Sequence, residues 1–205
     1  MKKRLLFFIA FSFILTFGAM AQFKLGANLG VPFSMRNFNV QDVEIQSSRP
    51  FNLGLITEIF VPLTGMGVEI SALYELERIN GGEIQNAVNA GFLVLPVNFK
   101  WKIGIPKFKF FLKGGPSFSI LMHNSGFLKV YTDEKNTENY KMKPFNWGLN
   151  FGLGLELFDK AQVGVSYFYN FSDNINLVSS LSNEEKINGS NPGGFIVTLT
   201  YFFIH

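Results

Sequence analysis

The clearest pattern in the chain is a strict alternation of apolar and polar positions between residues 145 and 158. The odd positions from Phe145 to Leu157 are all large and apolar, whereas the even positions up to Glu156 are glycine or polar. Because successive side chains of a β-strand point to opposite faces, this segment predicts a strand with one apolar and one polar face. It is also longer than the roughly 9–11 residues that a tilted strand needs to cross a bilayer. The pattern is typical of an outer-membrane β-barrel.

Seven further segments show the same alternation. With the first one, the predicted strands are residues 23–33, 51–61, 66–78, 88–103, 108–121, 145–158, 162–172 and 193–205. The connections between them alternate in length, and the long ones are the polar loops 34–50, 79–87, 122–144 and 173–192. Short periplasmic turns, longer outside loops and an even strand count characterise small outer-membrane barrels. The sequence therefore predicts an all-β fold, an eight-stranded antiparallel up-and-down transmembrane β-barrel with both termini on the periplasmic side.

The bulk of the apolar face decides which face of the barrel points outward. The interior of eight strands is only just wide enough to be filled by side chains. A soluble lipocalin-type barrel would place its apolar face inside, but Phe, Leu, Trp and Tyr at most of these positions are too large to fit there. The apolar face is therefore predicted to face lipid. Ile56, Phe60 and Phe111 are exceptions on the polar face, and Pro96 predicts a bulge or break in strand 88–103 because proline cannot donate to the ladder.

The positions of the aromatic residues agree with this orientation. Trp147 and Tyr74 are predicted near the outer rim, and Trp101, Tyr201 and Phe203 near the periplasmic rim. Tyr and Trp favour such membrane interfaces.

The inward face carries a balanced set of charges. These are Glu58, Glu69, Glu75, Glu77 and Glu156 against Lys24, Lys100, Lys102, Lys109 and Lys113. Charges in a narrow lumen are costly unless they are paired and hydrogen-bonded. We therefore expect a network of ion pairs and amides that plugs the barrel, with a selective channel or proton path as the alternative. Glu156 is expected to have a buried lysine partner, and Gly152 and Gly154 to leave room for inward lysines rather than to bind a nucleotide.

The first 21 residues have the features of a cleavable signal peptide. Lys2, Lys3 and Arg4 precede an apolar run, and the small residues Ala19 and Ala21 predict cleavage before Gln22. The predicted domains are thus a signal peptide (1–21) and an outer-membrane barrel (22–205), with an N-terminal membrane anchor as the alternative for the first segment. The net charge of +3 lies within this segment, so the charge gives no indication of nucleic-acid binding. The chain contains no cysteine.

Candidate chemistry is sparse. We predict no catalytic, cofactor-binding or metal-binding residue, and no cofactor. The two histidines are His123, beside a predicted loop, and His205 at the terminus, which are too few for a metal site. His123 lies near Ser125, so a lipid hydrolase is retained as a third hypothesis, because such triads are identified by geometry rather than by sequence order. Asn188, which starts a formal glycosylation sequon, is interpreted as part of a turn.

The sequence resembles the PorT-like outer-membrane β-barrel family of Bacteroidetes. The resemblance spans the mature chain and rests on FKLGANLG (23–30), LGLITEIFVPLTG (53–65), GVEISALYELE (67–77), LVLPVNFKWKIG (93–104), FFLKGGPSFSILM (110–122) and WGLNFGLGLEL (147–157). It implies an outer-membrane barrel, and the family name points to a component of an envelope secretion or assembly complex. Barrels of this kind commonly end on an aromatic residue read by the assembly machinery. Here His205 occupies that parity, and Phe203 is the nearest substitute.

The leading functional hypothesis is a non-catalytic outer-membrane barrel with a plugged polar interior and a structural or surface-interaction role. The alternative is a PorT-like component of an envelope complex, and the third is a lipid-modifying enzyme. The expected partners are outer-membrane lipid, the barrel-assembly machinery, and an envelope or extracellular protein bound through loops 34–50, 122–144 and 173–192. Binding sites commonly lie on loops held by a rigid scaffold.

Overall fold

The computed structural model describes residues 22–33, 36–40, 43–48, 51–61, 64–81, 88–105, 107–124, 128–133, 136–142, 144–171, 175–178 and 193–205. The predicted signal peptide, residues 1–21, lies outside this range. Within the described residues the chain forms thirteen β-strands. No helix in this part of the chain is long and apolar enough to cross a membrane.

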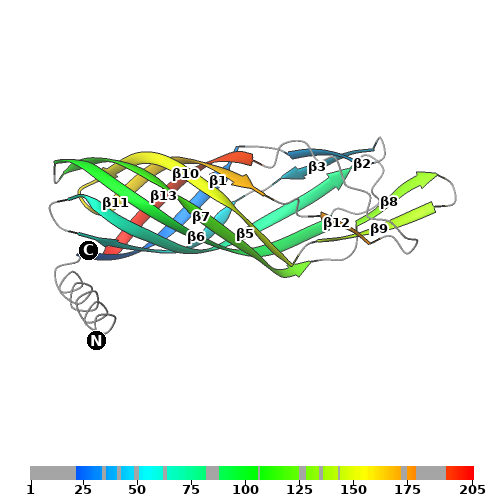
Figure 1. The fold of residues 1–205 in the computed structure, drawn as a ribbon, viewed down its shortest axis with the longest axis horizontal. Helices are drawn as coiled ribbons and strands as arrows, with labels where there is room; N and C mark the ends of the chain where they lie inside the picture. Colours follow the sequence, from blue (N-terminus) through cyan, green and yellow to red (C-terminus); the bar gives the residue numbers. More distant parts are fainter. Residues whose placement is uncertain are drawn as a thin grey trace, which may run out of the picture.

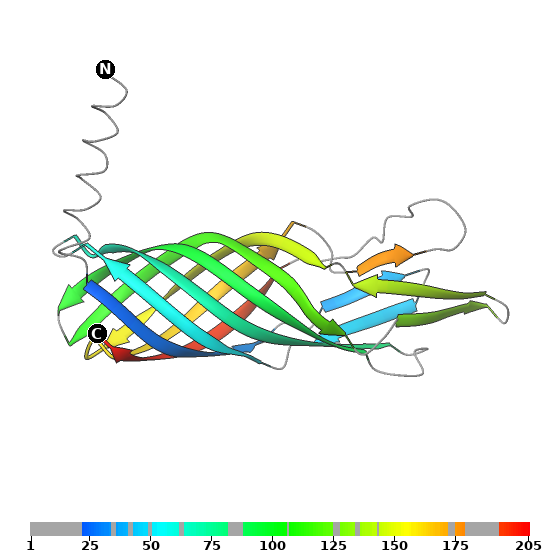
Figure 2. The same cartoon turned by 90° about the horizontal axis from the view of Figure 1, so that it is seen from below.

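Eight of the strands close into a barrel (Figures 1 and 2). They are β1 (Gln22–Pro32), β4 (Asn52–Phe60), β5 (Met66–Gly81), β6 (Val88–Ile105), β7 (Phe108–Asn124), β10 (Phe145–Leu157), β11 (Ala161–Asn170) and β13 (Gly193–Ile204). Each pairs antiparallel with its neighbours, β13 pairs with β1, and the pairing of β5 with β6 closes the ring. The predicted fold class is confirmed, and every predicted strand lies within a few residues of an observed one.

The two ends of the barrel differ in their connections. At one end, which we call the turn end, short connections join β4 to β5, β6 to β7 and β10 to β11. The start of β1 and the C-terminus lie at this end as well (Figure 1). The opposite end, the loop end, carries the long connections. Outer-membrane barrels have short turns in the periplasm and long loops outside, so the turn end is the one predicted to face the periplasm.

The long connections contain strands that the sequence did not predict. β2 (Arg36–Val40) and β3 (Val43–Ser48) form a hairpin, and β3 pairs with the last part of β5. β8 (Leu128–Asp133), β9 (Asn136–Met142) and β12 (Ile175–Val178) form a separate three-stranded sheet. The interpretation of 34–50, 122–144 and 173–192 as loops without strands was therefore wrong. Beyond the bilayer a strand needs no lipid-facing side, so the apolar alternation on which the prediction depended is absent there.

The ladder of β6 is interrupted on both sides near Pro96, although on the β7 side Pro96 itself pairs with Ser117 and the gap falls at the next two residues. The pairing with β5 skips Leu95 and Pro96, and the pairing with β7 skips Val97 and Asn98, without a change of register in either case. The predicted local break is thus present. The bulge between β6 and β7 lies instead at Gly91, where the register shifts by one residue.

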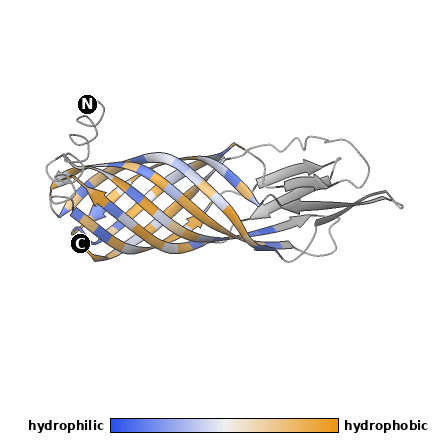
Figure 3. Cartoon of the chain, turned by 60° about the horizontal axis from the view of Figure 1, so that its bottom comes forward, coloured by the Kyte–Doolittle hydropathy of each residue, from blue (hydrophilic) through white to orange (hydrophobic). Residues whose placement is uncertain are grey.

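The exposed face of the barrel is apolar and the buried face is polar. On β10, Phe151 is 54% exposed and Leu153 is 51% exposed, whereas Glu156 is 1% exposed. Figure 3 shows the corresponding alternation of hydrophobic and hydrophilic residues along the barrel strands. The predicted rim residues Tyr74, Trp101, Trp147, Tyr201 and Phe203 all lie on the exposed face. The apolar surface therefore faces lipid, and the polar side chains form the core.

Candidate functional site: the polar lumen

A continuous chain of ion pairs runs through the middle of the lumen. The Lys100 ammonium lies 2.6 Å from Oε2 of Glu69 and also contacts Glu58. Lys102 bridges Glu58 and Glu156, so that charges of opposite sign alternate along the chain. All five side chains are at most 5% exposed. The residues come from β4, β5, β6 and β10, and the network therefore ties together strands on several sides of the barrel.

The network is extended at both ends. Toward the loop end, Lys113 Nζ lies 2.8 Å from Oε1 of Glu69. Toward the turn end, Lys24 Nζ lies 3.1 Å from Oε1 of Glu156 and also donates to the backbone carbonyl oxygen of Asp159 at 2.9 Å. Lys109 forms ion pairs with the carboxylates of both Glu156 and Asp159. Each of the five predicted inward lysines thus has an acidic partner, and Glu58, Glu69 and Glu156 are among these partners.

The remaining two inward glutamates lie nearer the loop end. Glu75 and Glu77 are buried, and neither is without a partner. The prediction of an inward set of five acids and five bases is therefore confirmed in its placement. The sequence missed Asp159, which joins the network from the turn between β10 and β11 because a turn residue has no strand parity.

Amide side chains complete the hydrogen bonding of the network. The side-chain NH₂ of Gln162 donates to Glu58 at 2.9 Å and to Glu156 at 2.6 Å, and its carbonyl oxygen accepts from Lys100 at 2.7 Å. Asn98 donates to Glu69 at 3.1 Å. Since buried charges are tolerated only when their remaining hydrogen-bonding positions are filled, these amides make the cluster stable in a closed interior.

Aromatic rings that break the binary pattern support the lysines. Phe111 is 2% exposed, and its ring centroid lies 4.0 Å from the Lys100 ammonium. Lys102 lies 4.2 Å from the ring centroid of Phe60. A desolvated cation over an aromatic face gains as much as about 2 kcal/mol. The exceptions seen in the sequence are therefore part of the core: they fill volume and stabilise the charged groups at the same time.

The glycines of β10 make space for this core. A Cβ atom added to Gly152 would lie 3.1 Å from Cε of Lys113 and would overlap the side chain of Ser166. A Cβ on Gly154 would lie 2.5 Å from the edge of the Phe111 ring. The expectation that these glycines leave room for inward lysines is confirmed for Gly152, while Gly154 makes room for an aromatic ring.

The turn between β10 and β11 has an unusual backbone. Phe158 and Asp159 have φ angles of 53° and 59°, and the Lys160 N–H donates to the Leu157 carbonyl oxygen at 3.0 Å. Positive φ at both central positions defines a type I′ turn, which matches the twist of a β-hairpin but favours Asn and Gly. The turn begins one residue earlier than predicted. The ion pairs of Asp159 hold it in this conformation.

The environment of Asp159 lowers the pKa of its carboxyl group. Partial burial raises the pKa, but the hydrogen bond from Lys109 and the positive charges of Lys24 and Lys109 outweigh burial, so that the pKa lies below its ordinary value of 3.8. The carboxylate is therefore ionised at neutral pH and available to both lysines.

Two hollows lie on either side of the network. A cavity of about 70 Å³ lies between the network and the loop end, with Lys113 and Glu69 among its lining residues. A second, open hollow of about 470 Å³ lies at the turn end, lined by Lys24, Trp101, Lys102 and other residues of that rim. The ion pairs separate the two spaces.

His123 lies outside the lumen, at the loop end of β7. Its Nε2 atom lies 3.4 Å from the Tyr74 hydroxyl oxygen, and the two rings stack with centroids 6.1 Å apart. Both rings lie across Gly91, where an added Cβ would meet them. Ser125, which the sequence analysis paired with His123, and Asn188 lie outside the described residues. In the described ranges, no three His, Cys, Asp or Glu side chains are grouped so that they could hold a metal ion.

Comparisons with known proteins place the chain in a family. A search of curated proteins gave no match. Among solved structures, the chain is similar to the outer membrane protein OprG from Pseudomonas aeruginosa, with 14% sequence identity and a TM-score of 0.49 over 90% of this chain and 96% of that one. Residues 18–176 match the model of the outer membrane protein beta-barrel domain. The match covers most of the sequence, and the chain therefore belongs to the outer membrane protein beta-barrel domain family.

Proposed function

We propose that this outer-membrane barrel has no catalytic activity, that its lumen is closed to ions, and that it acts through the structure at its loop end. The observation that supports the closed lumen is the network from Lys113 to Asp159, which spans several strands and contains five ammonium groups. An ion crossing the barrel would have to separate these pairs in a low-dielectric interior, where unpaired charges are strongly disfavoured.

Conductance tests this part of the proposal. The purified protein reconstituted in a planar bilayer is expected to give no stable unit current. A variant that removes two acids of the network, Glu58→Ala with Glu156→Ala, serves as a comparison that opens space. Stable, saturable unit conductance of the unmodified protein would overturn the closed-lumen proposal.

The surface role is supported by the pairing of strands from different loops. β12 pairs with β9 from Ile175 opposite Met142 to Val178 opposite Asn139, so the third and fourth long connections form one sheet. Strands hold a surface in a defined shape, which suits a binding role better than separate loops would. We propose an envelope or extracellular protein as the partner of this sheet.

Crosslinking on intact cells tests the surface role. Replacing residues 128–142 by a Gly/Ser linker is expected to abolish crosslinks to the partner while the barrel retains its heat-dependent shift on gels. The same replacement of residues 36–48 provides a matched control that leaves the three-stranded sheet in place. Unchanged crosslinking after the first replacement would contradict the role of this sheet.

A second candidate function is that of a component in a secretion or assembly complex, as the resemblance to the PorT-like family of Bacteroidetes implies. The open hollow at the turn end, which is lined by Lys109 and by Trp101 at its rim, favours this role. Co-purification of a stable envelope complex that is lost in Trp101→Ala would support this role. A chain that purifies alone from gently solubilised membranes would count against it.

We further propose that the assembly machinery reads Phe203, which is 53% exposed on the last strand. Phe203→Ala is expected to slow membrane assembly in cells, whereas Phe195→Ala, an equally exposed change earlier on β13, is expected to leave it unchanged. Equal assembly rates for both variants would contradict this partner.

A further inference from the structure

Gln22 is the first residue of β1 and lines the open hollow at the turn end. Its backbone pairs with Phe60 of β4, whereas the pairing of β1 with β13 begins only at Leu25. The start of β1, which Figure 2 shows at this end of the barrel, is therefore held by β4 alone, and Gln22 is exposed. Because the sequence predicts cleavage before this residue, Gln22 is expected to carry the free α-amino group of the mature chain.

A glutamine at the start of a chain holds a nucleophile and its target in the same residue. The neutral α-amino nitrogen attacks Cδ of the side-chain amide, and the new C–N bond closes a pyrrolidone ring. The bond from Cδ to the side-chain nitrogen breaks, and this nitrogen leaves as ammonia with one proton taken from the α-amine. The step consumes no oxidant, reductant or second reactant. Because both groups belong to one residue, covalent geometry alone brings them within reach of each other.

The hollow around Gln22 is rich in positive charge. Its lining contains the ammonium groups of Lys24, Lys102 and Lys109 and the carboxylate of Glu156. This carboxylate already contacts all three lysines, at 3.1 Å from Lys24 and 3.8 Å from Lys109. A protonated α-amine on Gln22 would therefore be a further cation around an acid that three ammonium groups share.

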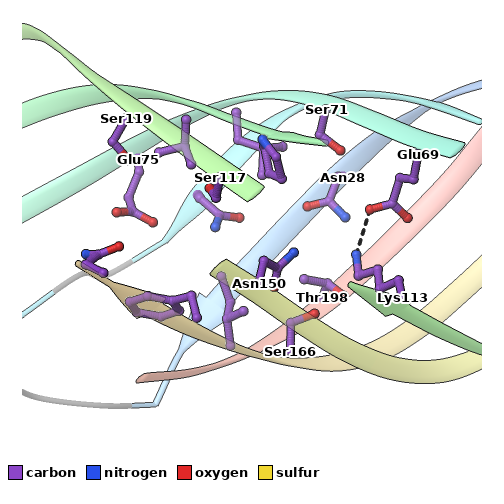
Figure 4. Close-up of a pocket in the computed structure, with 17 residues that line it drawn as sticks. Asn28, Glu69, Ser71, Glu75, Lys113, Ser117, Ser119, Asn150, Ser166 and Thr198 are labelled. Carbon is purple, nitrogen blue, oxygen red and sulfur yellow. Dashed lines mark hydrogen bonds and ion pairs between the residues drawn. The ribbon is translucent and has the colours of Figure 1, made fainter. Parts of the chain in front are cut away.

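The other acids of the network are shared as well. Their partners are Lys24 and Lys109 for Asp159, and Lys100 and Lys102 for Glu58. Near the loop end, Figure 4 shows Lys113 pointing to Glu69, which also pairs with Lys100. These contacts join five ammonium groups to four carboxylates. A further positive charge at the turn end would find each of these acids already engaged.

This environment favours the closed ring over the open residue. Positive groups nearby disfavour the protonated form of an amine, and the neutral form is the nucleophile. The product carries no charge at its nitrogen, so it adds no cation to the hollow. Phe60, Val61 and Trp101 line the same hollow, and such apolar walls suit a neutral ring better than an ammonium group.

We propose that Gln22 is a modification site, at which the mature chain begins with a pyroglutamyl residue formed by loss of ammonia. The proposal rests on the predicted cleavage before Gln22. It is independent of the closed lumen and of the surface role, because it requires neither the ion pairs to block conduction nor a protein partner. The modified chain has no α-ammonium group, so the lysines keep their acids to themselves.

The intact mass of the barrel isolated from outer membranes tests the proposal. The mature chain from Gln22 is expected to be lighter by one ammonia molecule than its sequence, and its N-terminus is expected to resist amine-reactive labelling. A chain of full mass with a reactive α-amine would overturn the proposal and leave the predicted cleavage intact. A chain that retains residues 1–21 would overturn the cleavage and the proposal together.

Gln22→Asn is the matched control. It keeps a side-chain amide and the α-amine, but its cyclisation would have to close a strained β-lactam. The variant is expected to keep its full mass and to react with the amine reagent. Loss of ammonia from this variant would overturn the assignment to position 22.

The rate of ring closure tests the part played by the lysines. A tagged chain cut by a protease just before Gln22 starts with a free glutamine, and its loss of ammonia can be followed by mass spectrometry. The barrel folded in detergent is expected to lose ammonia several times faster than the same chain unfolded in urea, because unfolding separates the lysines from the terminus. Equal rates would overturn the contribution of the hollow.

Discussion

Replacing Glu156 by leucine tests whether the ion-pair network stabilises the barrel. Glu156 connects the two halves of the network: one carboxylate oxygen lies 3.1 Å from Lys24, and the other contacts Lys102 and accepts from Gln162 at 2.6 Å. Its side chain is fully buried. In the Glu156→Leu variant, Lys102 keeps only Glu58 and Lys24 keeps only Asp159 as acidic partners. The interior then keeps all five ammonium groups but has one carboxylate fewer.

The expected loss follows from the balance of attraction and desolvation. At 3.1 Å and an effective dielectric constant of about 20, one pair attracts by about 5 kcal/mol. Most of this attraction offsets the cost of removing the charges from water, yet removing one partner of a buried pair costs about 3–5 kcal/mol because the other charge stays buried. Lys24 and Lys102 each retain one acid. We therefore expect the free energy of unfolding to fall by about 3 kcal/mol, at the low end of that range.

Equilibrium unfolding in urea, with the barrel inserted in short-chain lipid vesicles, measures this change. The matched control is Leu155→Ala, the neighbouring residue on β10, whose side chain is 39% exposed and faces lipid. The double variant Glu156→Leu with Lys102→Met is expected to recover part of the lost free energy of unfolding. It also removes the Lys102 charge, which the single variant leaves with one acidic partner fewer. An unchanged unfolding midpoint for Glu156→Leu would refute the network as a source of stability.

Three further predictions concern single features of the core. Phe111→Leu is expected to lower the free energy of unfolding by about 2–3 kcal/mol, since it removes the ring beneath Lys100 and leaves a small cavity, and urea unfolding measures it; a loss below about 0.5 kcal/mol would contradict the cation–π contact. Asp159 contributes stability above pH 3.8 that is lost as the pH falls through its lowered pKa, so the stability difference between wild type and Asp159→Asn is expected to be constant from about pH 5 to 8 and to shrink below about pH 4; a difference that does not shrink in acid would contradict the lowered pKa. Phe158→Asn is expected to raise the thermal midpoint in detergent, because asparagine tolerates a φ of 53° better than phenylalanine; a lower midpoint would show that the exposed ring has a stabilising role.

The barrel could be predicted from the sequence because its signal is repeated eight times. Each crossing strand must present one face to lipid, and the volume of an eight-stranded interior fixes which face that is. The strands beyond the bilayer could not be predicted in this way. β8 and β9 pair with each other without a lipid-facing side, so the constraint that creates the alternation is absent.

The partners within the lumen were predictable only as a set. Parity along each strand identifies Lys102 and Glu156 as inward residues, but the register and tilt of the whole barrel decide which acid meets which base. Asp159 was missed because it belongs to a turn, and Phe60 and Phe111 were noted as exceptions without a role. An aromatic residue at a polar-face position of a strand, close to inward-facing lysines, is the signal that could have given Phe60 and Phe111 a role.

The arrangement of charges also explains where substitutions matter most in this barrel. A lipid-facing residue such as Leu153 can be exchanged for another apolar residue with little effect, since lipid tails solvate both equally well. An inward residue cannot be exchanged in this way: when Glu69 is removed, Lys100 and Lys113 both lose an acidic partner. The stability of the inserted protein therefore depends on its polar interior, in contrast to a water-soluble domain.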